Sequence, residues 1–325
     1  MNRAARVRLV ALAVIWGTSF LLIKIGLEGL EPTQIVVARL TTGALALVLV
    51  VALTLRRLSP KLGAADLGHL AVLGVVSNVA PFYLFAWGEQ RVSSDLAGVS
   101  NATTPLFTVA LAIAVLPDER PTRARMVGLV TGFLGAVVIL APWRPGSTFG
   151  TLGGELACLG AAACYGVGFV YTRRFLSGRA LTPLSLAAGQ VAAAAIVMGL
   201  LAPAVATGPV HLTARVVAAM VVLGAVNTGL AYLLYHALVR EAGATGSSMV
   251  TYLIPVVAVV LGVVALGEQA GWNLIVGGAV VIGGVALTEG RLTGRLHRRR
   301  HDPSVPDSSS RVEPGPHGAD GLRRS

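Results

Sequence analysis

The stretch from Val7 to Glu28, VRLVALAVIWGTSFLLIKIGLE, decides how the rest of the chain is interpreted. It has no charged residue between Arg8 and Lys24. A helix needs about 20 such residues to cross a hydrocarbon core of roughly 30 Å. The basic start resembles a secretory signal, but no convincing small-residue cleavage site follows. We therefore predict that this stretch is a retained membrane-spanning helix.

The composition of the whole chain supports a membrane protein. Of the 325 residues, 54% are hydrophobic and 13% are charged, whereas a soluble domain has about 25% charged residues. So few charges cannot cover a surface that faces water, so we expect lipid around most of the chain. The net charge of +11 comes in short clusters between apolar segments. We interpret these clusters as topology signals and predict no nucleic-acid partner.

Apolar segments separated by loops with Pro, Arg or Glu recur along the chain, and each is too long for a barrel strand. The sequence therefore predicts an all-α integral membrane protein with ten transmembrane helices. We place them at about 7–28, 34–55, 67–89, 95–116, 122–140, 151–173, 181–202, 214–239, 245–266 and 271–289.

The distribution of Lys and Arg predicts the orientation. With the N-terminus inside, the outer loops hold three of these residues, Arg91, Arg144 and Arg215, and the inner segments hold most of the others. Both termini are therefore predicted to be cytoplasmic. Residues 290–325 are polar, and we expect a disordered cytoplasmic tail. Its cluster of arginines at 298–300 is interpreted as an anchor for the last helix, with binding to anionic lipid as the alternative.

The chain repeats itself at a spacing of about 150 residues. Trp16-Gly17, Phe20 and Lys24 match residues 149 positions later, and other matches follow in the same order. These pairs are Trp16/Tyr165, Gly17/Gly166, Phe20/Phe169, Lys24/Arg173, Pro32/Pro183, Arg39/Gln190, Gly74/Gly224, Asn78/Thr228, Pro105/Pro255, Glu119/Glu268 and Gly128/Gly277.

Each half, 7–140 and 151–289, holds five predicted spans. Because five is odd, the second half enters the membrane from the opposite side, which makes two inverted five-helix repeats. Many secondary transporters build alternating access from such repeats. The sequence therefore predicts a carrier of a small molecule in a lipid bilayer.

With these repeated positions the chain resembles the drug/metabolite transporter superfamily, in particular the bacterial ten-span type with two EamA-like repeats. The resemblance is carried by Trp16-Gly17-Thr18-Ser19-Phe20 with Lys24, by Arg39, and by Pro105, Glu119 and Gly128 with their second-half partners. It covers about residues 7–289. It implies an inner-membrane protein whose central cavity is lined mainly by spans 1, 3, 4, 6, 8 and 9. It also implies export of amino acids, related metabolites or toxic compounds.

Polar and aromatic residues inside the spans are the candidate substrate-binding residues. A charge at mid-membrane costs about 2.5–3.5 kcal/mol on insertion scales, so Arg39 and Lys24 are of interest. Arg39 holds a substrate carboxylate or pairs with Glu28, Glu31 or backbone carbonyls. Lys24 faces the cavity and holds an anionic group of the substrate, or it extends to the outer headgroups. The side-chain amides of Asn78 and Asn227 bind substrate or join neighbouring helices through hydrogen bonds. The predicted set is Trp16, Lys24, Arg39, Asn78, Tyr83, Asn101, Tyr165, Asn227, Tyr232 and Thr251.

The acidic residues, Glu89 among them, fall at span ends or in loops, which weakens a prediction of proton antiport. Glu155 and His236 remain as titratable candidates. Cys158 and Cys164 are too far apart on one helix for a disulfide, and we expect no metal and no cofactor. The chain has no Gly-Lys-Ser/Thr phosphate loop, so it is not predicted to be an ATP-driven pump by itself.

The prediction is therefore a non-enzymatic secondary transporter that exports amino acids or related small metabolites by alternating access. A multidrug exporter is the first alternative, and a membrane-embedded lipid-modifying enzyme is a remote one. Close packing of the glycines at 128, 132 and 135 and at 277, 278, 283 and 284 is expected within a monomer, with a homodimer as the alternative.

Reporter fusions test the predicted topology. Fusions after residues 61, 121 and 179 should all report a cytoplasmic location, because these positions follow Lys- and Arg-rich segments. Fusions in the predicted outer loops at 29–33 and 206–213 serve as the opposite control. A periplasmic signal at any of the first three positions would break the topology.

Overall fold

The computed structural model describes residues 3–54, 63–116, 122–140, 149–176, 178–179, 181–238, 250–269 and 271–288. These residues form helices, and no strand occurs among them. The elements in chain order are α1 (Arg3–Gly26), α2 (Pro32–Thr54), α3 (Ala64–Gly74), η1 (Val75–Val79), α4 (Ala80–Glu89), α5 (Ser94–Asn101), α6 (Thr104–Val115), α7 (Arg123–Leu140), α8 (Phe149–Tyr171), η2 (Thr172–Leu176), α9 (Pro183–Val205), α10 (Ala214–Gly224), η3 (Ala225–Leu230), α12 (Val250–Leu266) and α13 (Trp272–Thr288).

The predicted all-helical membrane fold is confirmed at this level. Seven helical segments are long and apolar enough to cross a bilayer: Arg6–Gly26, Pro32–Leu53, Ala64–Glu89, Ser94–Val115, Thr151–Leu176, Pro183–Val205 and Ala214–Leu238. Three shorter apolar helices, Met126–Ile139, Leu253–Leu266 and Trp272–Gly284, occupy the positions of the fifth, ninth and tenth predicted spans. The predicted tail at 290–325 lies outside the described residues.

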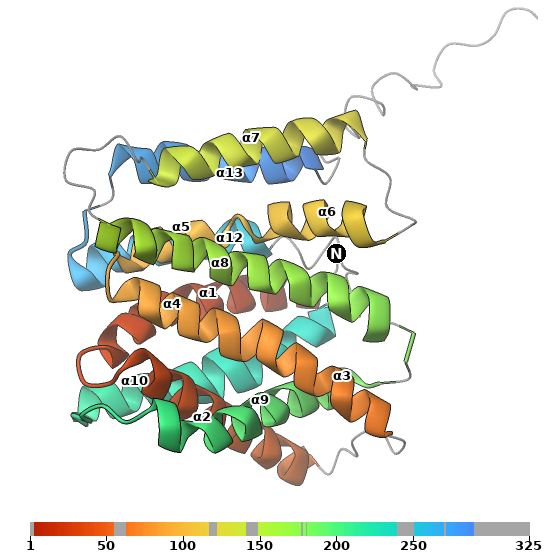
Figure 1. Ribbon diagram of the computed structural model, residues 1–325, viewed down its shortest axis with the longest axis vertical. Coiled ribbons are helices and arrows are strands. Elements are labelled where there is room, and N and C mark those ends of the chain that lie inside the picture. The colour runs from red at the N-terminus through yellow and green to blue at the C-terminus, as the bar shows by residue number, and fades with distance from the viewer. Residues whose placement is uncertain are drawn as a thin grey trace, which may run out of the picture.

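The helices form one bundle around α1. Helix α1 packs against α12 and α10, and α8 packs against α4 and α6. Helices α7 and α13 run side by side along one edge of the bundle, and α2, α9 and α10 lie toward the opposite edge (Figure 1). The largest apolar cluster joins α1, α4, α8, α10 and α12 through residues such as Leu12, Phe85, Ala161, Leu223 and Ile254. The centre of the bundle is therefore enclosed by both halves of the chain.

Two π-helical turns interrupt long helices at corresponding positions. Residues 75–79 join α3 to α4, and residues 225–230 follow α10. The first turn has an i→i−5 bond from the Ala80 N–H to the Val75 carbonyl, and Pro81 next to it has no N–H to donate. In the second turn, the Thr228 hydroxyl donates to the Leu223 carbonyl five residues before it (3.1 Å). Such turns change which side chains face the interior and are frequent at functional sites.

Pro105 and Pro255, which match in the sequence repeat, lie in different local structures. A turn at Ala102 and Thr103 separates α5 from α6, and Pro105 lies in the first turn of α6, where its missing N–H costs nothing. Pro255, by contrast, lies inside the unbroken helix α12. The fourth span is therefore interrupted just before Pro105, whereas the described part of the ninth span, Val250–Leu266, continues through Pro255 without a break.

Glycines bring α7 and α13 into backbone contact. A Cβ atom on Gly284 would lie 2.5 Å from the Gly132 nitrogen and 2.7 Å from the Gly128 carbonyl oxygen. A Cβ atom on Gly135 would lie 2.9 Å from the Gly277 carbonyl oxygen. Small residues of this kind let membrane helices approach closely enough for extensive van der Waals contact. The close packing expected from these glycines is thus found within the monomer.

Adjacent glycines on α13 provide a matched test of this contact. We expect Gly284→Ala to lower the free energy of unfolding by about 1–3 kcal/mol, because the new methyl group meets rigid backbone. Gly283→Ala meets nothing within 4 Å and should be neutral or stabilise by up to about 1 kcal/mol, since Ala favours helices over Gly. Thermal unfolding of the two purified variants decides this. Equal melting temperatures would rule out a tight α7–α13 contact.

Candidate functional site

Arg39 lies at the centre of the bundle, with 5% of its surface exposed. Its Nε atom donates to the Thr228 hydroxyl on η3 (2.9 Å), and its guanidinium carbon lies 3.5 Å from the centre of the Phe82 ring. Glu28 and Glu31, the acids weighed as its partners, do not pair with it. Its two terminal nitrogens donate no hydrogen bond to a described residue, although a guanidinium carries five N–H donors.

A second polar contact lies beside the first. The Gln190 side-chain nitrogen on α9 donates to the Asn78 side-chain oxygen on η1 (2.6 Å). The Asn78 nitrogen donates in turn to the Tyr232 hydroxyl (3.1 Å), and that hydroxyl donates to the Ser77 carbonyl (3.3 Å). We call Arg39, Asn78, Gln190, Thr228 and Tyr232 the central polar cluster. All are buried or half-buried, so each polar atom needs a partner from the protein or a ligand.

The two contacts connect positions that match in the sequence repeat. Arg39 matches Gln190 and Thr228 matches Asn78, so the Arg39–Thr228 and Gln190–Asn78 bonds join equivalent positions in opposite halves. Gly74 and Gly224, just before the π-helical turns, make both contacts possible. A Cβ atom on Gly74 would lie 2.8 Å from the Gln190 carbonyl oxygen, and one on Gly224 would lie 2.6 Å from the Arg39 carbonyl oxygen.

Aromatic rings pair in the same manner. Trp16 and Tyr235 have ring centres 5.5 Å apart, and the matching rings Tyr165 and Phe85 are 6.2 Å apart. Phe20 also lies 5.3 Å from Phe85, as Phe169 lies 6.2 Å from Tyr235. Trp16 further contacts the ring of Tyr232 at 6.3 Å. The aromatic residues therefore connect the central polar cluster to α1 and α8.

Asn227 adds an unpaired acceptor next to the central polar cluster. Its side-chain nitrogen donates to the Ile15 carbonyl and to the hydroxyls of Thr18 (2.8 Å) and Ser19 (3.0 Å) on α1. Its side-chain oxygen is buried without a hydrogen-bond partner among the described residues. A buried acceptor of this kind can bind a donor from a ligand.

Lys24 has a structural partner in the protein. Its Nζ atom donates to the carbonyls of Glu89 (2.6 Å) and Val92 (2.8 Å), at the carboxyl end of α4. Glu268, which follows α12, binds the other side of the turn between α4 and α5. Its carboxylate accepts hydrogen bonds from the Ser94 N–H (2.9 Å), the Ser94 hydroxyl (2.8 Å) and the Asp95 N–H (3.2 Å) at the start of α5. Both charges complement the helix ends that they contact.

Glu89 lies at a span end, as predicted, but its burial was not expected. It ends α4, as a span-end residue should, but it has no exposed surface, and neither carboxyl oxygen has a hydrogen-bond partner among the described residues. The preceding Gly88 explains the burial: a Cβ atom there would lie 2.8 Å from the Cys158 sulfur and 2.9 Å from the Gly154 carbonyl oxygen, so α4 and α8 touch. A Gly-Glu pair at a span end is the available sequence signal.

The remaining predicted residues lie around or outside this centre. Asn101, at the break between α5 and α6, accepts a hydrogen bond from the Thr104 hydroxyl (3.3 Å). Tyr83 is 38% exposed and is not brought together with the central polar cluster. The side chain of Thr251 lies outside the described part of the structure. The repeat itself contained the signal for Gln190 and Thr228, because they match Arg39 and Asn78.

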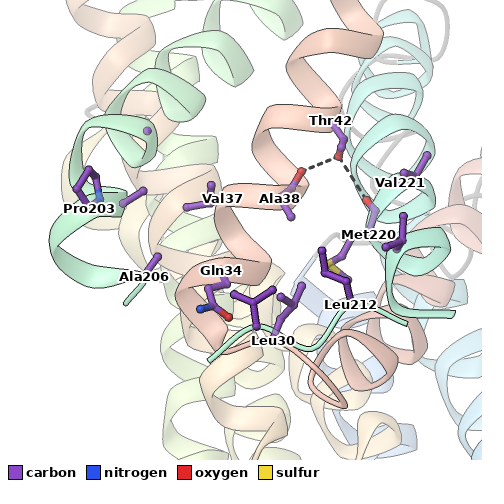
Figure 2. A pocket seen from close by; sticks show the side chains of 14 residues that line it. Leu30, Gln34, Val37, Ala38, Thr42, Pro203, Ala206, Leu212, Met220 and Val221 are labelled. Carbon is purple, nitrogen blue, oxygen red and sulfur yellow. Dashed lines mark hydrogen bonds between the residues drawn. The ribbon is translucent and has the colours of Figure 1, made fainter. Parts of the chain in front are cut away.

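A cavity of about 550 Å³ lies away from this centre, between α2, α9 and α10. Its lining is mostly apolar, and Figure 2 shows Thr42 bonded to the Ala38 and Met220 carbonyls instead of reaching into it. None of the described residues that line this cavity is charged. Among the described residues, no group of three His, Cys, Asp or Glu side chains is arranged to hold a metal ion. The polar chemistry of the described bundle therefore concentrates at the central polar cluster and around Glu89.

Comparison with known proteins gives consistent results. The model of the EamA-like transporter family matches residues 7–141 and again residues 152–289. A probable terminal-alkyne amino-acid exporter of Streptantibioticus cattleyicolor is 31% identical over 92% of this chain and 96% of its own length. The uncharacterized inner membrane transporter YedA of Escherichia coli is 28% identical over 87% and 90% of the two chains.

The fold also matches a solved structure, titled "Crystal structure of protein". That structure aligns with a TM-score of 0.63 at 21% identity, covering 93% of this chain and all of that one. At this identity the likeness concerns the fold alone.

The bond between Arg39 and Thr228 can be tested by its contribution to stability. We expect Thr228→Val to lower the free energy of unfolding by about 1–2 kcal/mol, because a charged buried donor loses its acceptor. Thr108→Val is the control, because the Thr108 hydroxyl bonds the Thr104 carbonyl one turn earlier on the same helix. We expect this variant to lower the free energy of unfolding by less. Thermal unfolding in detergent measures both. Equal losses would mean that the Arg39 contact contributes nothing specific.

Proposed function

The chain belongs to the EamA-like transporter family, and on that premise we propose that it exports an amino acid or a related small metabolite across the bacterial inner membrane. The observation that carries this proposal is that the two terminal guanidinium nitrogens of Arg39 donate no hydrogen bond to a described residue. One of its N–H donors binds Thr228, and its terminal nitrogens remain available in a buried setting. A guanidinium fork matches a carboxylate through two parallel hydrogen bonds.

An amino acid also offers an ammonium group, and the centre of the bundle has acceptors for it. The buried Asn227 oxygen lacks a partner among the described residues. The rings of Trp16, Tyr232 and Tyr235 lie close by and can attract a cation to their faces. In this proposal Arg39 binds the carboxylate, Asn227 accepts from the ammonium, and the aromatic rings contact the side chain.

The similarity to a relative named as a probable terminal-alkyne amino-acid exporter supports the substrate class. A terminal alkyne is a slim, apolar group, and the aromatic surroundings of the central polar cluster suit it. A multidrug exporter would be favoured by a wide aromatic cavity at the centre. In the described part of the chain the rings instead pack on one another, so we prefer the smaller substrate. The names of the family and its relatives indicate transporters rather than enzymes.

Transport proceeds by alternating access between two inverted five-helix repeats, 7–140 and 151–289, in ten spans. The two separate matches of the family model support this division. Further support comes from the equivalent bonds of Arg39 with Thr228 and of Gln190 with Asn78. Inverted repeats can exchange conformations around a central site and so open it to either side in turn.

The orientation that follows from the Lys and Arg residues has both termini in the cytoplasm. The end of the bundle with Lys24, Glu89 and Glu268 is then the outer end. The partners are a small-molecule substrate and the lipid bilayer, with a monomer as the transporting unit and a homodimer as the alternative.

Export can be tested by mass spectrometry of the culture medium. Cells expressing the native chain should enrich one class of amino acid outside. Arg39→Gln should reduce that enrichment about tenfold or more, because a charge-assisted hydrogen bond contributes about 1.5–3 kcal/mol. Arg91→Gln is the matched control, because Arg91 is exposed and lies on the Trp87 ring.

Competition in proteoliposomes tests directly whether Arg39 binds the substrate carboxylate. An amino acid should compete with the exported compound, and its amide, which lacks the carboxylate, should not. Equal competition by both would remove Arg39 from its assigned role. A strict requirement for ATP would reject the carrier mechanism.

A further inference from the structure

Glu89 has a setting that substrate recognition by Arg39 does not explain. Its carboxyl group has no exposed surface, and both oxygens lack a hydrogen-bond partner among the described residues. No Lys, Arg or His of the described chain forms an ion pair with it. Lys24 is close, but its Nζ atom binds the backbone carbonyl of Glu89 and that of Val92 instead.

An unpaired carboxylate in such a place is far more costly than a neutral carboxylic acid. The contact between α4 and α8 at Gly88, Gly154 and Cys158 leaves no room for solvent on that side. The side chain therefore carries a proton in this conformation. We propose that Glu89 is a proton-binding site through which transport is coupled to the proton gradient, an inference that rests on the proposed function.

The surroundings of Glu89 provide the physical link to the substrate. The charged and titratable side chains on the neighbouring elements include Lys24 on α1, Arg39 on α2, Asp95 on α5, Glu155, Cys158, Cys164 and Tyr165 on α8, and Glu268 after α12. Of these, Lys24, Glu268 and Arg39 act electrostatically on Glu89. When a substrate carboxylate neutralises Arg39, the field at Glu89 changes, and with it the proton affinity. Such reciprocal dependence of two sites is thermodynamic coupling.

The position at the end of α4 provides the route for exchange with water. Separation of α1 from α4 at this end would break the two bonds of Lys24 and admit solvent to the carboxyl group. Water and the nearby cations then stabilise the charged form, and the proton leaves. Closure of the same end encloses a protonated Glu89, which is the arrangement described here.

Chemical labelling tests the proton site without any substrate. Dicyclohexylcarbodiimide is apolar and reacts with protonated carboxylic acids, so it should modify Glu89 in the full-length purified protein, as located by peptide mass spectrometry. Glu89→Gln should lose this modification, and Glu155→Gln, a matched change of a nearby acid on α8, should keep it. A native protein in which other acids are labelled and Glu89 is not would overturn the proton site.

Proteoliposomes test the coupling, with propargylglycine, a terminal-alkyne amino acid, as the probe. With the membrane potential clamped at zero, a gradient of one pH unit should drive up to about tenfold accumulation if one proton moves per substrate. Glu89→Asp should keep a response to the gradient, and Glu89→Gln should reduce the gradient-driven to gradient-free ratio to about one. A full response in Glu89→Gln would overturn the coupling. If the native protein does not move the probe, the proposed function fails for this substrate class, and labelling still decides the proton site.

Discussion

A polar group inside a bilayer must find its hydrogen-bond partner within the protein, because the hydrocarbon core contains no water. In this chain the constraint is met by contacts between the two halves. Arg39 of the first half binds Thr228 of the second, and Gln190 of the second binds Asn78 of the first. The glycines before the π-helical turns allow the backbones to come close enough for these bonds. The centre of the bundle thus exists only when both halves are present, and the remaining packing is arranged around it.

Much of this could be predicted from the sequence, because lipid imposes simple rules. Long apolar segments must be helices, and the repeated positions identified Arg39 and Asn78 as central. The repeat also identified Gln190 and Thr228 as the matching positions, but only the structure shows that they bond to Asn78 and Arg39. The burial of single residues such as Tyr83 and Glu89 could not be predicted in the same way. The helices are apolar on nearly every side, so their pattern does not reveal which face points inward. Tyr83 proves to be partly exposed, and Glu89, the last residue of α4, is fully buried.

Packing between helices distant in the sequence determines the surroundings of Glu89, Lys24 and Glu268. Glu89 is buried because Gly88 lets α4 contact Gly154 and Cys158 of α8. Lys24 was expected at the headgroups or in the cavity, and it instead binds the carboxyl end of α4. Glu268 binds the amino end of α5 across the same turn. The α4–α5 turn is therefore fixed by a cation from one half and an anion from the other, each placed against the helix end of opposite polarity.

The inexact match between the halves has a consequence for the energy of the protein at rest. Two identical inverted halves would give two conformations, related by a two-fold rotation about an axis in the membrane plane, of equal free energy and equal population. Here Arg39 has Gln190 as its counterpart, and Phe82 has Tyr232, so the bonds made in one conformation cannot be reproduced in the other. A difference of about 1.4 kcal/mol, the size of one good hydrogen bond, already shifts the populations tenfold. Divergence between duplicated halves can therefore set the side of the membrane that an empty carrier faces.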